Sequence, residues 1–564
     1  MSSPAVIKSI YQKYQNKAYV EAEIDIRNLL AHSPQNHDAL RLGALTALAL
    51  NQVVTAQTRM QQACANVQMT AEMHNSWGNI YKAAEEWSQA EEAYKAAIKL
   101  DSDYAPVRHN LVNLLVMSGQ VDRAIIEIDR QAKAYGMSDF LREAKLTALT
   151  ELGQYEEAWD IAAQLPGDYR PDKIAYLKAR LLYFVRRYDE MRDMAALIPM
   201  DSNSAVQAFD LVTNAYAMSG DMTGFKDYIQ DITDHPEASI DILALAQLRL
   251  RRAGYDALAD KMIDRTDRQF GRNSFSLMSE AKALIRAQDY ASAVNRLKEA
   301  LSLNPGHFQI MLDYANACLL ATEYDTCQGL VHSLIQQAPN NQFVMALAAT
   351  LHRARGGPYE LLYDYDRFVQ VYDLTPPKGY DSITAFNAAL KTRLEYYHEF
   401  DSEPLNQTLR GGIQTNMDLF FVDDPVLKAF FKMLDAPIKA YMDHIGKDAV
   451  HPLLRRNTGR YRFNGAWSVK LSPHGHHVNH VHPKGWISSS YYVDLPDIID
   501  SSEAHEGWIK FGQPNLEGLN LPAEKFVQPI SGRLVLFPSY MWHGTIPFSG
   551  DQSRLTLPFD VVPA

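Results

Sequence analysis

The chain has 564 residues, of which 47% are hydrophobic and 22% are charged, and its formal net charge is -12. Single hydrophobic cores stop growing at about 250–300 residues, so this length predicts at least two domains, and the composition is that of a folded globular protein. The negative charge argues against a general nucleic-acid binder, which would need clustered Lys and Arg against the phosphates.

The first residues, MSSPAVIKSIYQKYQNKAY, have no basic start followed by an apolar run, so they do not predict a secretory signal. No apolar run approaches the roughly 20 residues that a membrane span needs. The three cysteines, Cys64, Cys318 and Cys327, are an odd number and lie far apart in the sequence. This spacing argues against a disulfide framework and for a reducing compartment. We therefore expect a cytoplasmic protein that does not enter the membrane.

A 34-residue period marks the first part of the chain. In SWGNIYKAAEEWSQAEEAYKAAIKLD, Ala90 stands on the second of two predicted helices, and steps of 34 residues reach further alanines. The series is Ala22, Ala56, Ala90, Ala124 and Ala158, and it continues with a drift of about one residue through Met191, Gly224, Leu258, Ala293 and Cys327. Proline follows twelve residues after the marker at Pro34, Pro305 and Pro339. Small residues suit close helix crossings and proline suits helix ends, so the pattern predicts about ten helix pairs.

These features resemble tetratricopeptide repeats over about residues 5–345. The resemblance implies an all-α solenoid, for which we set the boundaries at residues 1–355, with a concave face that binds an extended peptide or a partner protein. The alternative is that the repeats only support the following domain or mediate self-association. We expect a protein or peptide substrate bound with help of the solenoid, and neither nucleic acid nor membrane as a partner.

The texture changes in residues 356–564, which we predict to be a second domain. A short β-like run in DRFVQVYDLTPPKGY is followed by two helical stretches, SITAFNAALKTRLEYYHEF and DDPVLKAFFKMLDAPIKAYMDHIG. From about residue 458 the chain shows short β runs broken by Gly, Pro and Asn. The runs are GAWSVKL, WISSSYYVDLP, GWIKFG, GRLVLFPS and RLTLPFDVV. Such a meander predicts a sandwich or jelly roll, so the whole chain is expected to be a multidomain α+β protein.

Histidines cluster at the start of this β region. His480 and His482 are two residues apart in NHVHPKGW, so on a strand both would face the same side, with Val481 facing the other. Two imidazoles on one face could hold a transition metal if a third ligand joins them, and His543 in LVLFPSYMWHGTIPF is the candidate. The neighbouring His474, His476 and His477 are expected in a loop or in a substrate pocket.

A second pattern follows His543. Arg554 and Thr556 in SRLTLPFD share a strand face, and a guanidinium beside a hydroxyl is a good receptor for a carboxylate. Spacing alone thus predicts a metal site beside an anion site.

The combined string resembles Fe(II)- and 2-oxoglutarate-dependent oxygenases of the prolyl-hydroxylase-like kind, over roughly residues 455–564. Their signature runs His-x-Asp, then a distant His, then Arg-x-Ser. Here it reads His480-Val481-His482, His543 and Arg554-Leu555-Thr556, with Thr in place of Ser and with His482 in place of the carboxylate ligand.

The resemblance implies a double-stranded β-helix, or jelly roll, with its β core at about 455–564. It implies Fe(II) bound by His480 and His543, with His482 either as the third ligand or as a residue that supports the site while water completes the sphere. It also implies 2-oxoglutarate as cosubstrate, held by Arg554 and Thr556 and with Tyr492 as a further hydrogen-bond partner. With O2, such a dioxygenase would hydroxylate a protein or peptide side chain, and the three histidines and Arg554 would be its catalytic residues.

Two other functions remain open at this point. The chain could be a repeat-based interaction scaffold whose metal-binding barrel is catalytically degenerate, or a metal enzyme that works without 2-oxoglutarate. Consumption of the cosubstrate separates all three functions.

Overall fold

The structure is a computed structural model that describes residues 3–65, 67–398, 407–501, 504–516 and 518–564. The chain divides into two compact units. One contains residues 1–144, 329–341 and 564, and the other contains residues 145–328 and 342–563. Within the described residues, no helix is both long and apolar enough to cross a membrane.

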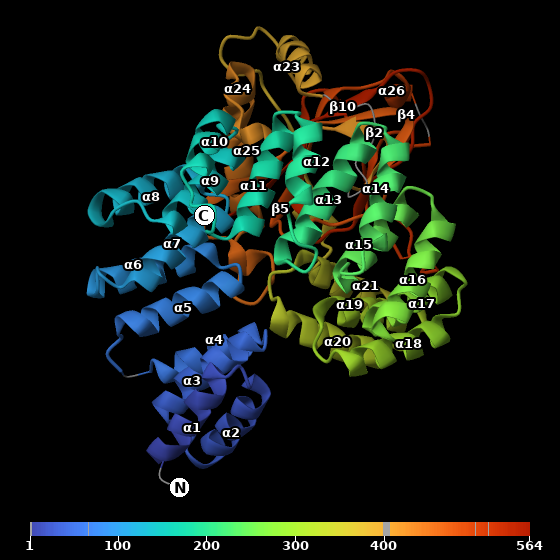
Figure 1. Ribbon diagram of the computed structural model, residues 1–564. Coiled ribbons are helices and arrows are strands. Elements are labelled where there is room, and N and C mark those ends of the chain that lie inside the picture. The colour runs from blue at the N-terminus through green and yellow to red at the C-terminus, as the bar shows by residue number, and fades with distance from the viewer. Residues whose placement is uncertain (1–2, 66, 399–406, 502–503, 517) are drawn as a thin grey trace. The chain divides into compact units, whose positions relative to one another are not determined.

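Helices fill the chain from residue 3 to residue 354 and are coloured from blue to yellow-green in Figure 1. In order they are α1 (Ser3–Gln15), α2 (Tyr19–His32), α3 (His37–Ala49), α4 (Val53–Ala63), α5 (Ala71–Ala83), α6 (Trp87–Leu100), α7 (Ala105–Met117), α8 (Val121–Tyr135), α9 (Asp139–Glu151), α10 (Tyr155–Ala163), α11 (Pro171–Phe184), α12 (Tyr188–Ala196), α13 (Asn203–Met218), α14 (Met222–Asp234), α15 (Ile240–Arg252), α16 (Asp256–Phe270), α17 (Ser274–Arg286), α18 (Tyr290–Leu303), α19 (Phe308–Leu320), α20 (Tyr324–Gln337) and α21 (Gln342–Ala354).

The predicted period is confirmed by where its marker residues lie. All ten fall on even-numbered helices, from α2 to α20, so each marks the second helix of a pair. The five alanines at 22, 56, 90, 124 and 158 are each 0% exposed. They lie where paired helices pack closely, so a larger side chain at these positions would push the helices apart. The three prolines stand just after α2, α18 and α20, where the second helix of a pair ends. The all-α solenoid of ten helix pairs is therefore present, and α21 follows it.

A glycine shows how closely the helices of one pair approach. A β-carbon added to Gly78 on α5 would lie 2.3 Å from the ring of Tyr94 on α6. The Tyr94 ring is fully buried, and its hydroxyl donates a hydrogen bond of 2.8 Å to Asn79 Oδ1. The missing side chain at Gly78 therefore makes room for an aromatic residue that ties the two helices together.

Buried acids between the repeats are paired with arginine. Glu23 on α2 is 5% exposed, and its carboxylate accepts hydrogen bonds from Arg59 Nη1 at 2.7 Å and from Arg27 Nε at 2.7 Å. Glu91 on α6 is bound in the same way by Arg123 of the next repeat. Each of these two pairs joins neighbouring helices and compensates its own buried carboxylate.

The remaining helical segments follow α21 in the chain. They are η1 (Tyr359–Leu361), α22 (Tyr365–Phe368), α23 (Ile383–Tyr397), η2 (Leu419–Phe421), α24 (Pro425–Met433), α25 (Asp435–Ile445), η3 (Leu454–Arg456) and, within the sheet region, α26 (Ile498–Ser501). The first predicted helical stretch is α23. The second is divided into α24 and α25, because Pro437 in the first turn of α25 suits the start of a helix and not its interior.

Eleven strands are found among the described residues. They are β1 (Gln370–Asp373), β2 (Leu409–Gln414), β3 (Tyr461–Ala466), β4 (Val469–His477), β5 (Ile487–Asp494), β6 (Ile509–Phe511), β7 (Lys525–Val527), β8 (Arg533–Pro538), β9 (His543–Thr545), β10 (Arg554–Thr556) and β11 (Phe559–Pro563). Every predicted β run contains a strand. The sequence did not predict β2, β7 or β9, and β2 carries two glycines, which weaken the strand signal.

The strands pair antiparallel in two sheets. An eight-stranded sheet follows the order β1-β8-β5-β10-β4-β2, with β11 paired to both β5 and β3, and a three-stranded sheet follows the order β7-β6-β9. Strand β5 is central: it pairs with β8 along one edge and with β11 and then β10 along the other. An antiparallel β domain therefore follows the helical repeats. Its closure into a double-stranded β-helix, and a domain boundary at residue 355, stay predictions.

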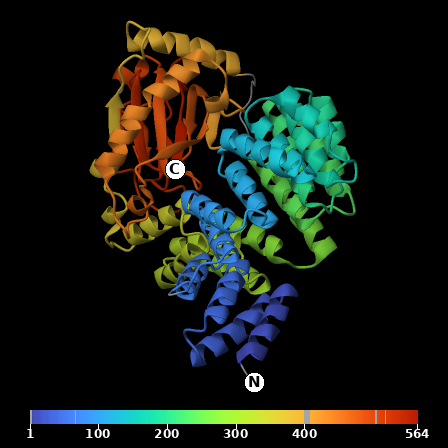
Figure 2. The same cartoon turned by 90° about the vertical axis from the view of Figure 1, so that its left-hand side faces the viewer.

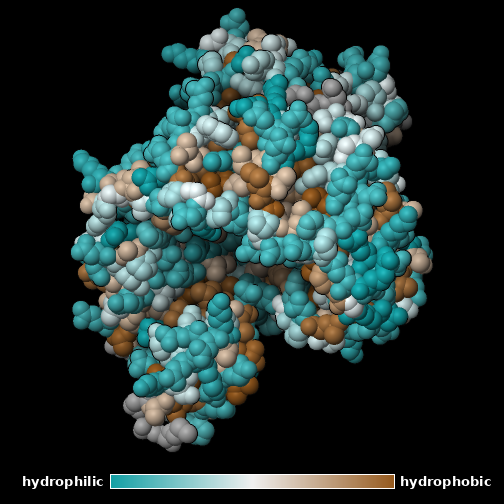
Figure 3. Space-filling model, viewed as in Figure 1, coloured by the Kyte–Doolittle hydropathy of each residue, from teal (hydrophilic) through white to brown (hydrophobic). Residues whose placement is uncertain are grey.

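Helices cover one side of this domain. Helix α23 contacts β5 and helix α22 contacts β8, and the gold and orange helices of residues 383–445 lie across the red strands in Figure 2. The face of the molecule shown in Figure 3 is mostly hydrophilic, with hydrophobic residues in small groups. The cavity described next is lined by residues of β4, β9, β10 and β11.

Candidate metal centre and anion site

A cavity of about 460 Å³ opens into the β domain and contains the residues that the sequence singled out. This volume lies in the range of small-molecule sites, about 300–1,000 Å³. Its described lining includes His477, His480, His482, His543, Arg554, Thr556, Asp560, Trp467, Phe537, Gln407 and Gln414. The candidate metal ligands and the candidate carboxylate receptor therefore share one space.

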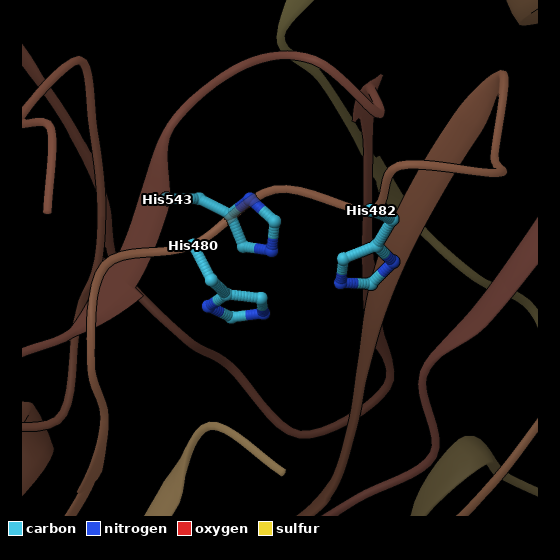
Figure 4. Close-up of side chains that lie close together, drawn as sticks. All are labelled: His480, His482 and His543. Carbon is cyan, nitrogen blue, oxygen red and sulfur yellow. The ribbon is translucent and has the colours of Figure 1, made fainter. Parts of the chain in front are cut away.

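Three imidazoles form a cluster in this cavity. One ring nitrogen from each of His480, His482 and His543 lies within 4.8 Å of the others. The ring centroids are 4.2 Å apart for His480 and His543, 5.2 Å for His480 and His482, and 5.1 Å for His482 and His543. In Figure 4 a nitrogen of each ring points toward the space between them. The arrangement is that of three nitrogen donors directed at one common point, which suits a transition metal.

The outer nitrogen of each ring is already engaged. His480 Nδ1 lies 2.8 Å from the carbonyl oxygen of Val478, and His543 Nδ1 lies 2.9 Å from that of Met541. A carbonyl only accepts, so each Nδ1 must carry the proton and donate it. The Nε2 lone pairs of both rings are then free and face the centre, as metal binding requires.

His482 is oriented by a carboxylate. Its Nδ1 lies 2.7 Å from Oδ1 and 2.8 Å from Oδ2 of Asp560, which is 7% exposed, and 3.1 Å from the Ser488 hydroxyl. The carboxylate keeps the proton on Nδ1 and makes Nε2 a stronger donor. The sequence analysis missed Asp560. The signal that could have revealed it was a single acid in FDVV, an otherwise apolar strand end.

Backbone contacts hold the cluster, although not as the sequence predicted. His480 and His482 were expected on one strand, but they lie in the loop between β4 and β5, and only His480 forms a bridge, with His543. The His480 amide donates to the His543 carbonyl at 2.8 Å, and the His543 amide donates back at 3.1 Å. The His482 amide donates to the Ser539 carbonyl at 3.0 Å. The two-residue spacing thus brought the rings together by loop contacts and not by strand alternation.

Burial keeps the imidazoles of His480 and His543 neutral. It lowers the pKa of His480 to about 3, with the positive form of His482 adding to the shift. It also lowers the pKa of His543 well below the usual value, with His480 and His482 adding. Both rings therefore offer a lone pair at neutral pH without first losing a proton.

Arg554 lies in the same cavity as a buried cation without an acid. It stands on β10 between β4 and β5 and is 2% exposed. No carboxylate in the described part of the chain pairs with it, and its Nε has no hydrogen-bond partner. Burial lowers the pKa of its guanidinium, and Tyr492 opposes the shift. Burying a guanidinium without a partner is energetically costly, and a bound anion would offset that cost.

The residues around Arg554 complete the anion site. Thr556 lines the cavity on the same strand, and its hydroxyl lies 3.5 Å from the Val469 carbonyl, too long for a strong hydrogen bond. Tyr492 is fully buried, and its ring lies under the guanidinium at 5.1 Å. It does not appear among the described residues that line the cavity, so the geometry favours support of Arg554 over direct contact with a ligand.

The three other clustered histidines separate. His477, at the end of β4, lines the cavity, and burial lowers its pKa well below the usual value. Its Nδ1 lies 3.2 Å from the Thr408 hydroxyl. His474 is exposed, and neither it nor His476 is among the described lining residues. His477 is thus placed in the pocket, as one of the two predicted locations.

Helix α21 packs against the residue next to His543. Trp542, next to His543, donates from Nε1 to the Thr350 hydroxyl of α21 at 3.0 Å, and its ring meets Phe343 edge-on at 5.5 Å. Arg353 of the same helix donates to the Gly512 carbonyl at 2.8 Å, beside β6. The strand that carries His543 therefore depends on a helix that lies two hundred residues earlier in the sequence.

Comparison with known families agrees with both parts of the chain. Residues 465–560 match the family described as "Putative 2OG-Fe(II) oxygenase", and residues 81–139 and 284–350 match the tetratricopeptide repeat. The chain therefore combines tetratricopeptide repeats with a C-terminal segment that matches this oxygenase family. No curated protein matches the chain significantly.

Three solved structures are similar over part of the chain. The APC/C hetero-tetramer Cut9-Hcn1 is 12% identical, covers 62% of this chain and 83% of that chain, and has a TM-score of 0.25. Pseudomonas aeruginosa pilF is 18% identical, covers 40% of this chain and 96% of that chain, and has a TM-score of 0.29. A tetratricopeptide repeat protein from Parabacteroides merdae is 15% identical, covers 43% and 97%, and has a TM-score of 0.25.

Proposed function

We propose that the chain is an Fe(II)- and 2-oxoglutarate-dependent dioxygenase that hydroxylates a side chain of a protein or peptide bound with help of the repeats. One observation carries the proposal. A cluster of three imidazoles, whose Nδ1 atoms are all engaged, shares a cavity with a buried arginine that has no carboxylate partner among the described residues. The match of residues 465–560 to an oxygenase family supports the same reaction class.

The residues present fit Fe(II). His480, His482 and His543 would hold it through Nε2, because Nδ1 of each ring is engaged elsewhere. Three neutral ligands leave the full charge of the ion uncompensated, unlike a site with a carboxylate ligand. Asp560 offsets part of this charge through the hydrogen bond to His482. In the usual signature an acid binds the metal directly, whereas here Asp560 would act on it only through its hydrogen bond to His482.

The residues also fit 2-oxoglutarate. Its distal carboxylate would lie against Arg554, which can donate two parallel hydrogen bonds, while the Thr556 hydroxyl adds a third donor. Tyr492 would hold the guanidinium in place through its ring. The cosubstrate would remove the cost of a buried unpaired cation, so binding and neutralisation occur together.

When bound, Fe(II) with O2 would supply the oxidation of 2-oxoglutarate to succinate and CO2, with the second oxygen atom inserted into a substrate C–H bond to give an alcohol. The protein's own part is positional. Arg554 would hold one end of the cosubstrate and the metal on the histidine cluster would hold the other, while His477, which burial keeps neutral, lines the same cavity. A buried cavity also excludes the water that would weaken each of these contacts.

The compartment and partners follow from the rest of the chain. The three thiols are free, and burial raises the pKa of Cys318 and of Cys327 to about 12, so they are unreactive. We place the enzyme in the cytoplasm on this ground, and we assign delivery of the protein or peptide substrate to the repeats, which match a family of protein-binding modules.

The test is succinate formation from 2-oxoglutarate by the full chain, purified without oxygen and then supplied with Fe(II) and O2. We expect turnover in the wild type and loss of turnover in Arg554→Ala. Arg533→Ala is the matched control, because Arg533 belongs to the same sheet but is paired with Asp373 at 2.7 Å. A metal-loaded protein that forms no succinate would instead support the scaffold with a degenerate barrel.

A further inference from the structure

A second cavity, of about 240 Å³, adjoins the metal cavity. Helices α11 and α13 of the repeats supply Tyr183 and Asn214 on one side, and the segment at the end of β2 supplies Asn416 on the other. Gln407 and Gln414 line both cavities, so the two cavities are neighbours.

The second cavity contains side-chain amide atoms that lack hydrogen bonds of good geometry. Asn214 is 7% exposed, and its Oδ1 has no hydrogen-bond partner. Both polar atoms of Asn416 are buried without a hydrogen bond of good geometry, and the Tyr183 hydroxyl, whose pKa burial raises and this amide lowers in part, is its neighbour in the cavity. In the described part of the chain, no other Asn or Gln has both side-chain polar atoms buried and unpaired. Buried polar atoms are unfavourable when unmet, so these amides point to a ligand that offers both a donor and an acceptor.

Charge does not define that ligand. Among the described residues that line this cavity, Asp210 is the one with an ionised group, and it is already bound by Arg249. A phosphate or another charged metabolite would find no free partner of opposite sign. A peptide main chain, in contrast, is neutral and presents one N–H and one C=O per residue.

We propose that this amide groove, defined by Asn214, Gln414 and Asn416, binds the main chain of an extended segment of the substrate and feeds it toward the metal cavity. The inference rests on the proposed function, since the segment is the substrate of the hydroxylation. The Asn416 amide has the donor and acceptor needed to pair with the N–H and C=O of a single extended residue, which point to the same side of the chain. Tyr176 and Tyr183 supply aromatic walls that tolerate different side chains.

Main-chain recognition has a consequence for the substrate class. Peptide N–H and C=O groups are free to bind only where they are not already used in a helix or a sheet. The substrate would therefore be an unfolded loop or tail of a protein, and the groove would impose little preference on its side chains. Selection of the hydroxylated residue would take place at the metal cavity.

The experiment uses the full chain loaded with Zn(II) and 2-oxoglutarate, so that no turnover occurs. A display library of random peptides about fifteen residues long, which span about 50 Å when extended, is the probe. We expect enriched peptides whose affinity for Asn214→Ala/Asn416→Ala is at least about tenfold lower. Three of the four polar side-chain atoms that the double substitution removes have no hydrogen-bond partner of good geometry, so we expect the variant to fold, and Asn295→Ala, an exposed residue on α18, is the matched control.

A second measurement does not depend on protein variants. Each enriched peptide is scanned by alanine substitution and, separately, by N-methylation of single peptide units, with affinity read by fluorescence polarisation. Main-chain recognition predicts positions where N-methylation lowers affinity at least about tenfold while alanine at the same position lowers it little. The proposal is overturned if no peptide is enriched, if the double variant binds like the wild type, or if only alanine substitutions weaken binding.

Failure of this inference is distinguishable from failure of the proposed function. Peptide binding is measured without O2 chemistry, whereas the dioxygenase activity is measured by succinate. Groove-dependent peptide binding without succinate formation would reject the dioxygenase and keep the groove. Succinate formation without groove-dependent peptide binding would do the reverse.

Discussion

Buried charge is treated differently in the two parts of the molecule. In the repeats, Glu23 is buried at 5% exposure and is held by two arginines. In the β domain, Arg554 is buried at 2% exposure and has no carboxylate among the described residues. The repeats thus use charge to join neighbouring helices, and the sheet keeps a charge unpaired.

The contrast between paired and unpaired buried charges indicates which part of the molecule binds a ligand. A paired buried ion can be explained by folding alone, because each member compensates the other. An unpaired buried ion makes folding less favourable and is retained when something outside the chain completes it. The same logic applies to the three imidazoles, whose outer nitrogens are engaged while their inner nitrogens are not. The predictions that follow alter one of these charges or ligands at a time.

The largest expected effect comes from His543. His543→Ala removes one of the three nitrogens that lie within 4.8 Å of one another, and we expect it to abolish binding of the roughly one metal ion per chain seen in the wild type. Metal content is measured after dialysis against a weak chelator. His444→Ala, an exposed histidine on α25, should keep full occupancy. Full occupancy of the His543 variant would show that the metal lies elsewhere.

Removal of Arg554 separates the two kinds of buried charge most directly. Arg554→Ala should raise the 2-oxoglutarate concentration needed for half-maximal binding at least about 30-fold, since a charge-assisted contact with a buried carboxylate contributes roughly 2–5 kcal/mol. It should not lower the thermal stability of the ligand-free protein, because no acid is left unpaired. Calorimetric titration and melting curves measure the two effects. A destabilised apoprotein with unchanged cosubstrate binding would make Arg554 structural.

The third prediction concerns His482 and the acid behind it. If His482 is a ligand, His482→Ala should weaken Fe(II) binding by about 10-fold or more, and Asp560→Asn should weaken it by about 10-fold, because the hydrogen-bonded partner orients the ring and raises its donor strength. Competition with a chelator measures both affinities. Unchanged affinity in both variants would leave His480 and His543 as the only protein ligands.

The smallest expected effect lies in the repeats. Arg59→Ala leaves Glu23 with only Arg27, so we expect α2–α4 to lose about 1–3 kcal/mol of stability against local opening. Amide hydrogen exchange in α2–α4 measures this loss. Cosubstrate binding at Arg554 should not change. Equal protection in variant and wild type would mean that the buried Glu23–Arg59 pair does not stabilise the repeats, which would contradict the structural role assigned to it.

The helical part was largely predictable because its contacts are local. Each repeat packs against its neighbours in sequence, so a 34-residue period in small residues such as Ala90 already predicts which helix faces meet. The sheet was less predictable. Strand β8 is apolar and was expected, but β2 contains Gly411 and Gly412, and its partner β4 lies more than fifty residues later.

The site was predicted by residue type more than by geometry. The spacing of His480 and His482 indicated two rings on one side, yet a loop anchored by the His543 and Ser539 carbonyls performs that task. The departure of His482 from the usual acid was visible in the sequence. Its compensation by Asp560, seventy-eight residues away, was not.

The sequence by itself determined the order of the two parts, the repeat period, and the residue types that can bind a metal and a carboxylate. These features depend on local spacing and on side-chain chemistry, both of which are written along the chain. The fold was needed to learn that Arg554 has no carboxylate partner among the described residues, that Asp560 hydrogen-bonds His482, and that Asn214 and Asn416 line the same groove. Each of these depends on which distant groups become neighbours when the chain folds, and a buried group is paired or unpaired only with respect to such neighbours.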